Sequence, residues 1–284
     1  MVRGWYTAVS GMRAQQWRLD SVANNLANVD TDGYKVEQPA FRAFPELLLR
    51  RMKDDGQYPH PFGSGDAAPI IGKLGTGVEF NEIYVYFGQG ALKETHSDFD
   101  VALDGKGFFA ISTPYGERYT RNGSFFLGKE GYLLTKEGYQ VLGENGPIMV
   151  KANNFQIDRD GRIWINAEYD DGDPNMLVSR ESNTWDEPVL LDTLKIVDFD
   201  FDRYLKKQGT SLYYATEYSG PAMIMEEENR PTVWQGFMEA ANVEPVREMV
   251  QMIEVNRAYE ANQKVIQAHD SMLGVLINQV ARVG

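Results

Sequence analysis

Two stretches at the ends of the chain have the hydrophobic spacing of helices that pack against other helices. Near the N-terminus, alternating steps of four and three positions separate a seam of seven residues: Trp5, Val9, Met12, Gln16, Leu19, Ala23 and Leu26. This is the spacing of a coiled-coil seam, with Gln16 as its polar member. We expect a helix that ends near Asp32-Gly33, because Gly33 can adopt the positive φ that often ends a helix.

A second seam occupies the last forty residues. Two sets of residues each recur every seven positions: Met252, Tyr259, Ile266, Leu273 and Val280, and then Val255, Asn262, His269, Leu276 and Val283. Asn242 as a cap, Pro245 in the first turn and Glu248 close behind predict where this helix begins. A helix from about 243 to 282 would be roughly 60 Å long.

Three asparagines, Asn24, Asn25 and Asn28, lie in the last turns of the first predicted helix. Asparagine is unfavourable inside helices, because its side chain competes for backbone hydrogen bonds. Two interpretations remain: the asparagines cap a fraying helix end, or they lie between neighbouring copies and fix their register.

The two predicted helices also leave two arrangements open. They can form a hairpin that closes one molecule, or they can pack against other copies as well. The candidate assembly interface therefore comprises Trp5, Val9, Met12, Gln16, Leu19, Ala23, Asn24, Asn25, Leu26, Asn28, Met252, Tyr259, Asn262, Ile266, His269, Leu273, Leu276 and Val280.

The middle of the chain has a β pattern. Between residues 78 and 150, short runs of β-branched and aromatic residues alternate with turn signals, of which Asn122-Gly123 is the strongest hairpin signal. The repeated "KEGY" at 129–132 and 136–139 indicates a short hairpin repeated after seven residues. Residues 151–235 continue with β-like runs around an acidic loop. We predict an α+β fold in which the terminal helices pair as a coiled coil and a mainly-β domain is inserted between them.

Residues 36–80 join these parts. The segment "QYPHPFGSGDAAPIIGKLGTG" is rich in Pro and Gly, and it is longer than most loops in a compact domain. We interpret 36–80 as an extended arm that reaches a neighbouring subunit; the alternative is a flexible surface loop. The expected domains are 1–35 with 237–284 (helical), 36–80 (arm) and 81–236 (mainly β), with Gly33 and Gly123 as turn residues.

Composition narrows the possible partners. Of 284 residues, 43% are hydrophobic and 24% are charged, as in an ordinary folded protein. The net charge of -13 argues against a nucleic-acid partner, since phosphate binding needs clustered Lys and Arg. The absence of cysteine excludes disulfides and thiolate metal sites. We expect no membrane span, because no run of about 18 apolar residues occurs, and no cleavable signal peptide.

Candidate catalytic chemistry is sparse. His60, His96 and His269 fit no close-spaced metal pattern, and "GKGFF" lacks the spacing of a phosphate-binding loop. Asp170, Asp171 and Asp173 lack the spacing and the final Glu of a calcium loop. We expect no enzymatic activity, metal, cofactor or small-molecule substrate. The alternative is a carbohydrate-binding β-domain, suggested by Trp164, Trp185 and Tyr213, although such aromatics are more often core residues.

Three segments resemble one family. "NNLANVDTDGYK" resembles the N-terminal signature of bacterial flagellar axial proteins, the rod, hook and hook-associated subunits. "NVEPVREMVQMIEVNRAYEANQKVIQAHDSML" is similar to their C-terminal signature, and residues 100–148 to the central part of the rod and hook proteins. "ERYTRNGSF", "GYQVLGENGPI" and "FRAFPELLLRRM" look most like the proximal rod subunit, with the distal rod subunit second. Asp30 and Asp32 depart from the usual Asn and small residue.

The resemblance implies a structural subunit without catalysis. Such subunits leave the cell unfolded through the flagellar type III export apparatus, without cleavage, and fold on joining the growing periplasmic rod of the basal body. Their partners are copies of themselves and other rod and hook axial proteins. The resemblance further implies that the terminal helices bundle into a helical tube that transmits motor torque to the hook and filament.

Overall fold

The structure, a computed structural model, describes residues 2–50, 58–60, 63–65, 70–166, 174–175, 177, 185, 188–226 and 228–283; within these, it describes no side chains for 2–3, 58–60, 63–65 and 280–283. The chain divides into two compact units. Unit 1 comprises Met1–Asn24, Gln38–Ile83 and Val246–Gly284, and unit 2 comprises Asn25–Glu37 and Tyr84–Pro245. The segment expected to be a separate arm is thus largely in the same unit as the terminal helices.

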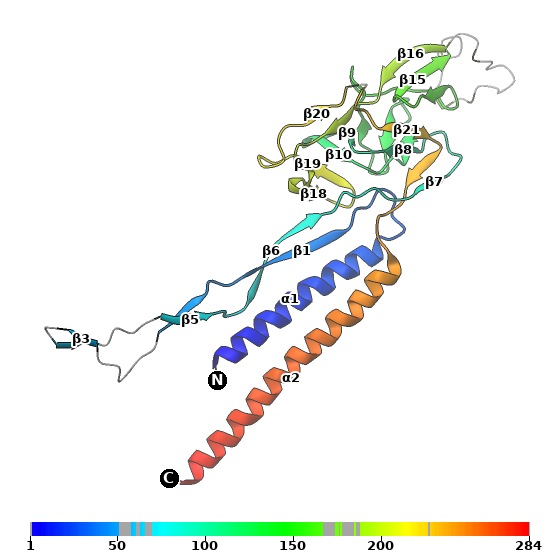
Figure 1. Cartoon of the computed structure of the whole chain (residues 1–284). Helices are drawn as coiled ribbons and strands as arrows, with labels where there is room; N and C mark the ends of the chain where they lie inside the picture. Colours follow the sequence, from blue (N-terminus) through cyan, green and yellow to red (C-terminus); the bar gives the residue numbers. More distant parts are fainter. Residues whose placement is uncertain are drawn as a thin grey trace. The chain divides into compact units, whose positions relative to one another are not determined.

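Two antiparallel helices form one side of unit 1 (Figure 1). Helix α1 (Val2–Ala27) has 26 residues and α2 (Pro245–Val283) has 39, so they are about 39 Å and 58 Å long. A Cβ added to Gly4 would lie 3.0 Å from His269 Nε2, and one added to Gly11 would lie 3.1 Å from Asn262 Nδ2. The two helices are therefore in contact at two glycines of α1, Gly4 and Gly11. Pairing as a regular coiled coil stays a prediction.

The helix boundaries differ from the expected ones at two points. Helix α1 ends at Ala27 and not near Asp32, and turns follow until Gly33, whose φ is +67°. Asn242 does not cap α2, because its side chain accepts the Val36 N–H at 2.8 Å and donates to the carbonyls of Tyr86 and Gly88. Pro245 is the first residue of α2, where a missing N–H costs nothing.

A two-stranded ribbon completes unit 1. Its strand pairs are β1 (Glu37–Ala43) with β6 (Val78–Val85), β2 (Leu47–Arg50) with β5 (Ile70–Leu74), and β3 (Tyr58–His60) with β4 (Gly63–Gly65). The described residues of the predicted arm are therefore largely strand-paired. The ribbon contacts α1, because the ring of Trp17 stacks on that of Phe80 at a centroid distance of 4.5 Å.

Unit 2 is built from β-sheets (Figure 1). The largest sheet has the order β11-β12-β13-β9-β10-β19-β18, and β17 pairs with both β9 and β20. Its strands are β9 (Phe108–Thr113), β10 (Gly116–Thr120), β11 (Phe125–Leu127), β12 (Leu133–Thr135), β13 (Gln140–Val141), β17 (Ile196–Asp198), β18 (Lys206–Gln208), β19 (Leu212–Tyr214) and β20 (Met223–Ile224).

Unit 2 also contains smaller sheets. Strands β14 (Phe155–Ile157), β15 (Arg162–Asn166) and β16 (Pro188–Thr193) form a three-stranded sheet. Strand β8 (Val101–Asp104) pairs with β21 (Thr232–Gln235), and β7 (Leu92–Glu94) pairs with β22 (Phe237–Glu239). A short 3-10 helix, η2 (Asp202–Tyr204), precedes β18. The expectation of a mainly-β middle between two helices is confirmed.

Strand β9 lies between two hydrophobic clusters. Phe109 belongs to a large cluster with Phe125, Ile163 and Leu194, whereas Phe108 and Ala110 belong to a second cluster with Tyr213. Alternate residues of a strand point to opposite faces, so β9 is covered on both sides. Burial raises the pKa of Tyr119, which packs in the second cluster, to about 12.

Of the turns predicted from the sequence, those in the two "KEGY" segments are present, and the one at Asn122-Gly123 does not form a hairpin. Gly131 and Gly138, in the two "KEGY" segments, have φ of +84° and +86° and lie between the paired strands β11, β12 and β13. The expected Asn122-Gly123 hairpin is wrong, because β10 pairs with β9 and β19 while β11 pairs with β12. A Cβ on Gly123 would lie 1.6 Å from the Val101 carbonyl oxygen, so this glycine permits close backbone approach.

Candidate assembly surfaces

The N-terminal signature forms a buried polar network with the residues that precede α2. We call this network the signature clasp; it comprises Asn25, Gly33, Tyr34, Lys35, Glu37, Glu239 and Asn242, all in unit 2. The Gly33 N–H donates to the Glu239 carbonyl at 2.7 Å, and the Asn242 N–H donates to the Tyr34 carbonyl at 3.3 Å. A Cβ on Gly33 would lie 2.5 Å from the Asn122 backbone nitrogen, so glycine fits here for both its space and its φ.

An ion pair lies at the centre of the clasp. Lys35 Nζ is 2.6 Å from Glu239 Oε1 and donates to the Gly88 carbonyl at 2.8 Å, and the two charged side chains are 0% and 1% exposed. Burial lowers the pKa of Lys35, while the Glu239 carboxylate opposes that shift. Arg121 Nη1 approaches Glu239 Oε2 at 3.6 Å, which is an ion pair but too long for a hydrogen bond.

The side-chain amide of Asn25 both donates a hydrogen bond to the backbone of Glu37 and accepts one from it. Its Nδ2 donates to the Glu37 carbonyl at 3.0 Å, and its Oδ1 accepts the Glu37 N–H and the Tyr34 hydroxyl, each at 3.0 Å. Lys207 adds a second ion pair to Glu37 at 2.6 Å, and its ammonium lies 4.4 Å from the centroid of the Tyr34 ring. Asn25 is 2% exposed, so its expected place on an assembly surface is wrong: its polar atoms are used inside the protomer.

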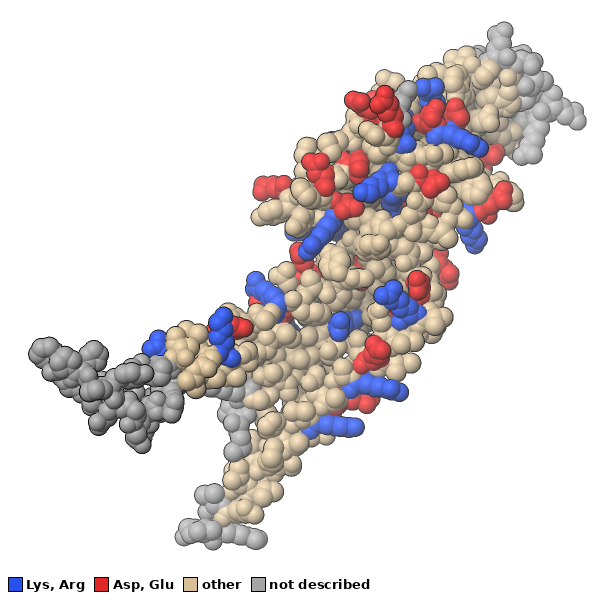
Figure 2. Space-filling view, in the orientation of Figure 1, with Lys and Arg blue, Asp and Glu red and all other residues tan. Residues whose placement is uncertain are grey.

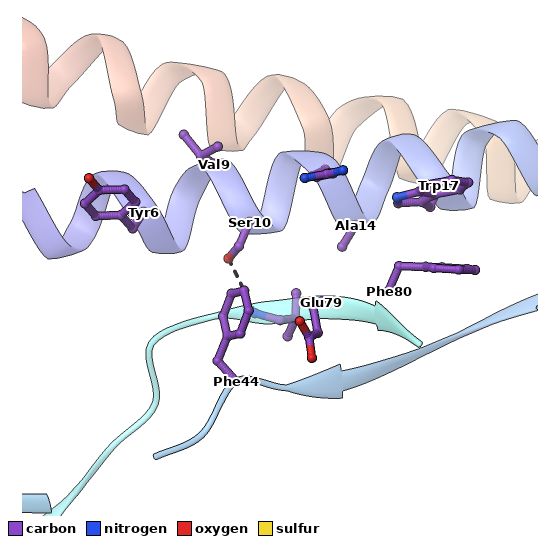
Figure 3. Close-up of a pocket in the computed structure, with 10 residues that line it drawn as sticks. Tyr6, Val9, Ser10, Ala14, Trp17, Phe44, Glu79 and Phe80 are labelled. Carbon is purple, nitrogen blue, oxygen red and sulfur yellow. Dashed lines mark hydrogen bonds between the residues drawn. The ribbon is translucent and has the colours of Figure 1, made fainter. Parts of the chain in front are cut away.

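An apolar groove of about 420 Å³ lies in unit 1 between α1 and the ribbon (Figure 3). Its apolar walls are formed by Tyr6, Val9, Trp17, Phe44, Val78 and Phe80. Ser10 fixes the ribbon against α1, because its hydroxyl accepts the Val78 N–H at 3.4 Å. Arg13 and Glu79 line the same groove, and Glu79 is paired with Arg42. The groove was not expected from the sequence, although Trp17 and Phe80 are large apolar residues in amphipathic segments.

The other candidate interface residues have differing exposure. Half-buried ones are Met12, Leu19, Leu26, Asn28, Met252, Asn262, Ile266, His269 and Leu273, while Trp5, Val9, Gln16, Ala23, Asn24, Tyr259 and Leu276 are exposed. The side chain of Val280 lies outside the described residues. Further apolar residues of α2 are exposed, namely Val246, Met249, Val250, Ile253, Val265, Met272, Val275 and Ile277. Their role as an assembly interface stays a prediction.

Three family descriptions match separate parts of the chain. "Flagella basal body rod protein" matches residues 6–35, "Flagellar hook protein FlgE/F/G D1 domain" matches 102–165, and "Flagellar basal body rod FlgEFG protein C-terminal" matches 235–279. Whole-length relatives also match. A protein named flagellar basal-body rod protein FlgG from Borreliella burgdorferi is 34% identical, over 98% of both chains. The chain belongs to the flagellar basal-body rod protein family.

Two further relatives of this rod family carry different names. A flagellar hook-basal body complex protein FlhO from Bacillus subtilis is 31% identical over the full length of both chains. A flagellar basal-body rod protein FlgF from Caulobacter vibrioides is 32% identical over 92% of this chain and 91% of that protein. The resemblance read from the sequence is thus confirmed at the level of the rod family, whose subunits are structural.

The two terminal family matches cover most of the two helices and several residues of the signature clasp. The match at 6–35 covers most of α1 with Gly33, Tyr34 and Lys35, and the match at 235–279 covers Glu239 with most of α2. Sequence reasoning missed the Lys35–Glu239 pair and Tyr34. A signal was present for one of the two partners: Glu239 is the only charged residue in "GFMEAANV", whereas Lys35 has Asp32 and Glu37 within three positions. A single charge within an apolar run is a mark of a buried pair.

Other candidate sites gain no support. Tyr213 is completely buried, so it cannot present its ring to a sugar, and its pKa is raised by burial. Among the described residues, no group of three His, Asp or Glu side chains is placed to hold a metal ion. Asp170, Asp171 and Asp173 lie outside the described residues. No helix in the described part of the chain combines the length and hydropathy needed to cross a membrane.

Proposed function

We propose that this chain is an axial subunit of the flagellar rod that assembles with copies of itself and with other rod and hook subunits through its terminal helices. The single observation that supports this is the exposed apolar surface of α2, whose residues include Ile253, Met272, Val275 and Ile277. Large exposed apolar patches on a protein surface mark contacts with other molecules. In this proposal the contacts repeat head to tail without closing, which builds a helical tube.

A second exposed apolar surface, on the ribbon, also supports the proposal. Leu47, Leu48, Ile70 and Ile71 are all exposed on the paired strands β2 and β5. Apolar side chains on a two-stranded ribbon need a further layer to bury them. We therefore retain the interpretation of residues 36–80 as an arm that contacts a neighbouring subunit. Export through the flagellar type III apparatus without a cleaved signal, and residence in the periplasmic rod, are parts of the same proposal.

Two rod positions remain as candidates. The motifs "ERYTRNGSF" and "FRAFPELLLRRM" favour the proximal rod subunit, the FlgF type, and this is the position that we propose. The 34% identity to a relative named FlgG favours the distal position as the second candidate. Labelling the chain in isolated basal bodies and measuring its distance from the inner membrane ring decides between the two.

Substitution of one exposed residue tests the assembly role. Leu276 is exposed, so Leu276→Asp is expected to leave the protomer folded while it places a charge in the proposed contact. We expect incorporation into basal bodies and swimming to fall at least about tenfold, since burial of an unpaired charge disfavours assembly strongly. Asn278→Asp adds the same charge on the opposite side of the helix and is the matched control. Equal incorporation of both variants would contradict the proposal.

A further inference from the structure

Two Asn-Gly pairs occur in the chain, Asn122-Gly123 and Asn145-Gly146. In this dipeptide the glycine nitrogen can attack the side-chain carbonyl carbon of the asparagine, because no glycine side chain hinders its approach. A five-membered ring forms if the backbone between the two atoms is free to turn. The surroundings of each pair therefore decide whether it can react.

The Asn122-Gly123 pair is packed closely on both sides. A Cβ on Gly123 would lie 1.6 Å from the Val101 carbonyl oxygen, and the Val101 N–H donates to the Gly123 carbonyl at 3.0 Å. The backbone nitrogen of Asn122 lies 2.5 Å from the Cβ position of Gly33. The side-chain oxygen of Asn122 accepts the Ser124 N–H at 3.0 Å. Ring formation would break these contacts, so it requires local unfolding at this pair.

The Asn145-Gly146 pair lies in an open turn between Leu142 and Pro147, which form an isolated bridge. Asn145 is exposed, and beyond its chain neighbours no heavy atom lies within 4 Å of the Cβ position of Gly146. The Gly146 carbonyl accepts the Gly143 N–H at 2.7 Å, but the Gly146 N–H has no acceptor among the described residues. The attacking nitrogen is thus free, and the backbone around it can turn without displacing a packed neighbour.

We propose that Asn145-Gly146 is a site of spontaneous deamidation, from which the fold protects Asn122-Gly123. The Gly146 nitrogen bonds to Cγ of Asn145 and gives up its proton, while the bond from Cγ to Nδ2 breaks and ammonia leaves with that proton. Water then opens the succinimide ring at one of its two carbonyls. Opening at Cγ leaves aspartate, and opening at the backbone carbonyl leaves isoaspartate, which adds one carbon to the main chain. The reaction consumes one water, releases one ammonia and changes no oxidation state.

The modification has a structural consequence because Asn145 anchors its turn to β16. Its Nδ2 donates to Asp192 Oδ1 at 2.9 Å, and its backbone N–H donates to Asp192 Oδ2 at 3.3 Å. The Glu144 N–H donates to the Thr193 carbonyl at 2.9 Å beside them. Asp192 is only 9% exposed and makes no ion pair within the described part of the chain. Its carboxylate therefore depends on these donors in place of water.

Deamidation replaces the donating amide with a carboxylate that faces the carboxylate of Asp192. Like charges at this distance repel, and burial of Asp192 keeps water from screening them. Arg230 offers little relief, since its Nη2 is already paired with Glu144 Oε1 at 2.5 Å. Figure 2 shows acidic and basic side chains interspersed over unit 2, so the described residues form no broad basic patch on the face in view. We therefore expect the modified turn to bind β16 more weakly.

Peptide mapping of one sample measures both sites. The folded full chain is kept at pH 8, and trypsin then releases residues 122–129 with one Asn-Gly pair and residues 137–151 with the other. Deamidation adds about 1 Da to a peptide, and chromatography separates its isoaspartate and aspartate forms. We expect Asn145 to react at least about tenfold faster than Asn122 in the folded chain. In concentrated guanidinium chloride we expect rates within about twofold of each other, because neither pair is then packed.

The comparison of folded and denatured chains makes the outcome decisive. Equal rates in the folded chain, or a faster reaction at Asn122, would overturn the proposal. A rate at Asn145 more than about tenfold lower in the folded chain than in denaturant would also overturn it, because the turn would then be closed to the reaction.

Substitutions test the effect of the product on the turn. Asn145→Asp is expected to lower the melting temperature by about 2–4 °C more than Asn145→Ala, which removes the amide without adding a charge. Adding Asp192→Asn to Asn145→Asp is expected to recover this difference, since the amide and the carboxylate have then exchanged places. Equal melting temperatures for the two single variants, or no recovery in the double variant, would contradict repulsion between the two carboxylates.

Discussion

Charged and apolar side chains have opposite environments in the signature clasp and in residues 270–283 at the C-terminal end of α2, which we call the α2 overhang. In the clasp, the charged side chains of Lys35 and Glu239 are buried and paired with each other. On the overhang, the aliphatic side chains of Val275 and Ile277 are exposed to water. The polar residues of the clasp are thus satisfied within the protomer, whereas the apolar residues of the helix are exposed on it, and the proposed function assigns this exposed surface to a partner. Substitutions in the clasp should therefore reduce stability, and substitutions on the overhang should reduce assembly.

The largest effect on stability is expected at the buried ion pair. Lys35→Met removes the ammonium and leaves the Glu239 carboxylate buried without its closest partner. Breaking such a pair costs about 3–5 kcal/mol, because the Gly90 N–H at 2.8 Å and Arg121 at 3.6 Å do not replace the ammonium for a carboxylate that has lost its water. Urea unfolding of the full chain, followed by circular dichroism, measures this change in the free energy of unfolding.

A second ion pair of unit 2 provides the control. Lys195 Nζ lies 2.9 Å from Glu117 Oε2, but the two side chains are 21% and 32% exposed. Lys195→Met is expected to cost about 1 kcal/mol or less, since water replaces the lost partner. If both lysine variants lose the same stability, burial of the clasp pair has no special effect and the comparison fails.

A smaller loss is expected at Gly33. Gly33→Ala forces a Cβ into a residue with φ of +67° and places it 2.5 Å from the Asn122 backbone nitrogen. Backbone strain together with the displaced neighbour should cost about 2–3 kcal/mol. Gly138→Ala is the matched control, because Gly138 has φ of +86° with nothing near its Cβ position, and strain alone costs about 1 kcal/mol. Equal thermal shifts for the two variants would show that the contact with Asn122 is unimportant.

Several elements of the fold could be predicted from the sequence. The seven-residue spacing predicted both helices, and β-branched runs between glycine turns predicted the mainly-β middle, because these patterns are local. The Asn122-Gly123 hairpin failed because Gly123 lies against the Val101 carbonyl, a contact that spacing does not reveal. Asn25 was misplaced for a related reason: its partners Tyr34 and Glu37 are known only once the chain has turned back after α1.

The candidate site was predictable to a lesser degree. Amphipathic spacing identifies which residues share a helix face, but it does not say which part of that face a second helix covers. Contact of Gly4 with His269 fixes how far α1 extends along α2, and this alone defines the overhang. The groove likewise depends on the stacking of Trp17 against Phe80, residues more than sixty positions apart. Tertiary contacts of this kind carry no local signal.

The smallest effect is expected at Asp32, in the turn that leads into the clasp. Burial, and then the nearby Asp100 carboxylate, raise the pKa of Asp32 above its usual 3.8. The folded protein therefore holds this proton to a higher pH than the unfolded chain does, so the free energy of unfolding falls as pH rises from 3.8 through the raised folded pKa. Above that pH the full cost of the ionised carboxylate is present, and below 3.8 it is absent.

Asp32→Asn removes that cost without changing the shape of the side chain. We expect the variant to be slightly more stable than the natural chain at pH 7 and equal to it at pH 3, with the difference growing between these limits. Asp30→Asn, an exposed position two residues earlier, is expected to show no such pH-dependent gain. Urea titrations across this range measure the difference. A gain that persists at pH 3 would show that the carboxylate charge is not its cause. The turn that contains Asp32 would then tolerate a charge as readily as the exposed surface of α2 does.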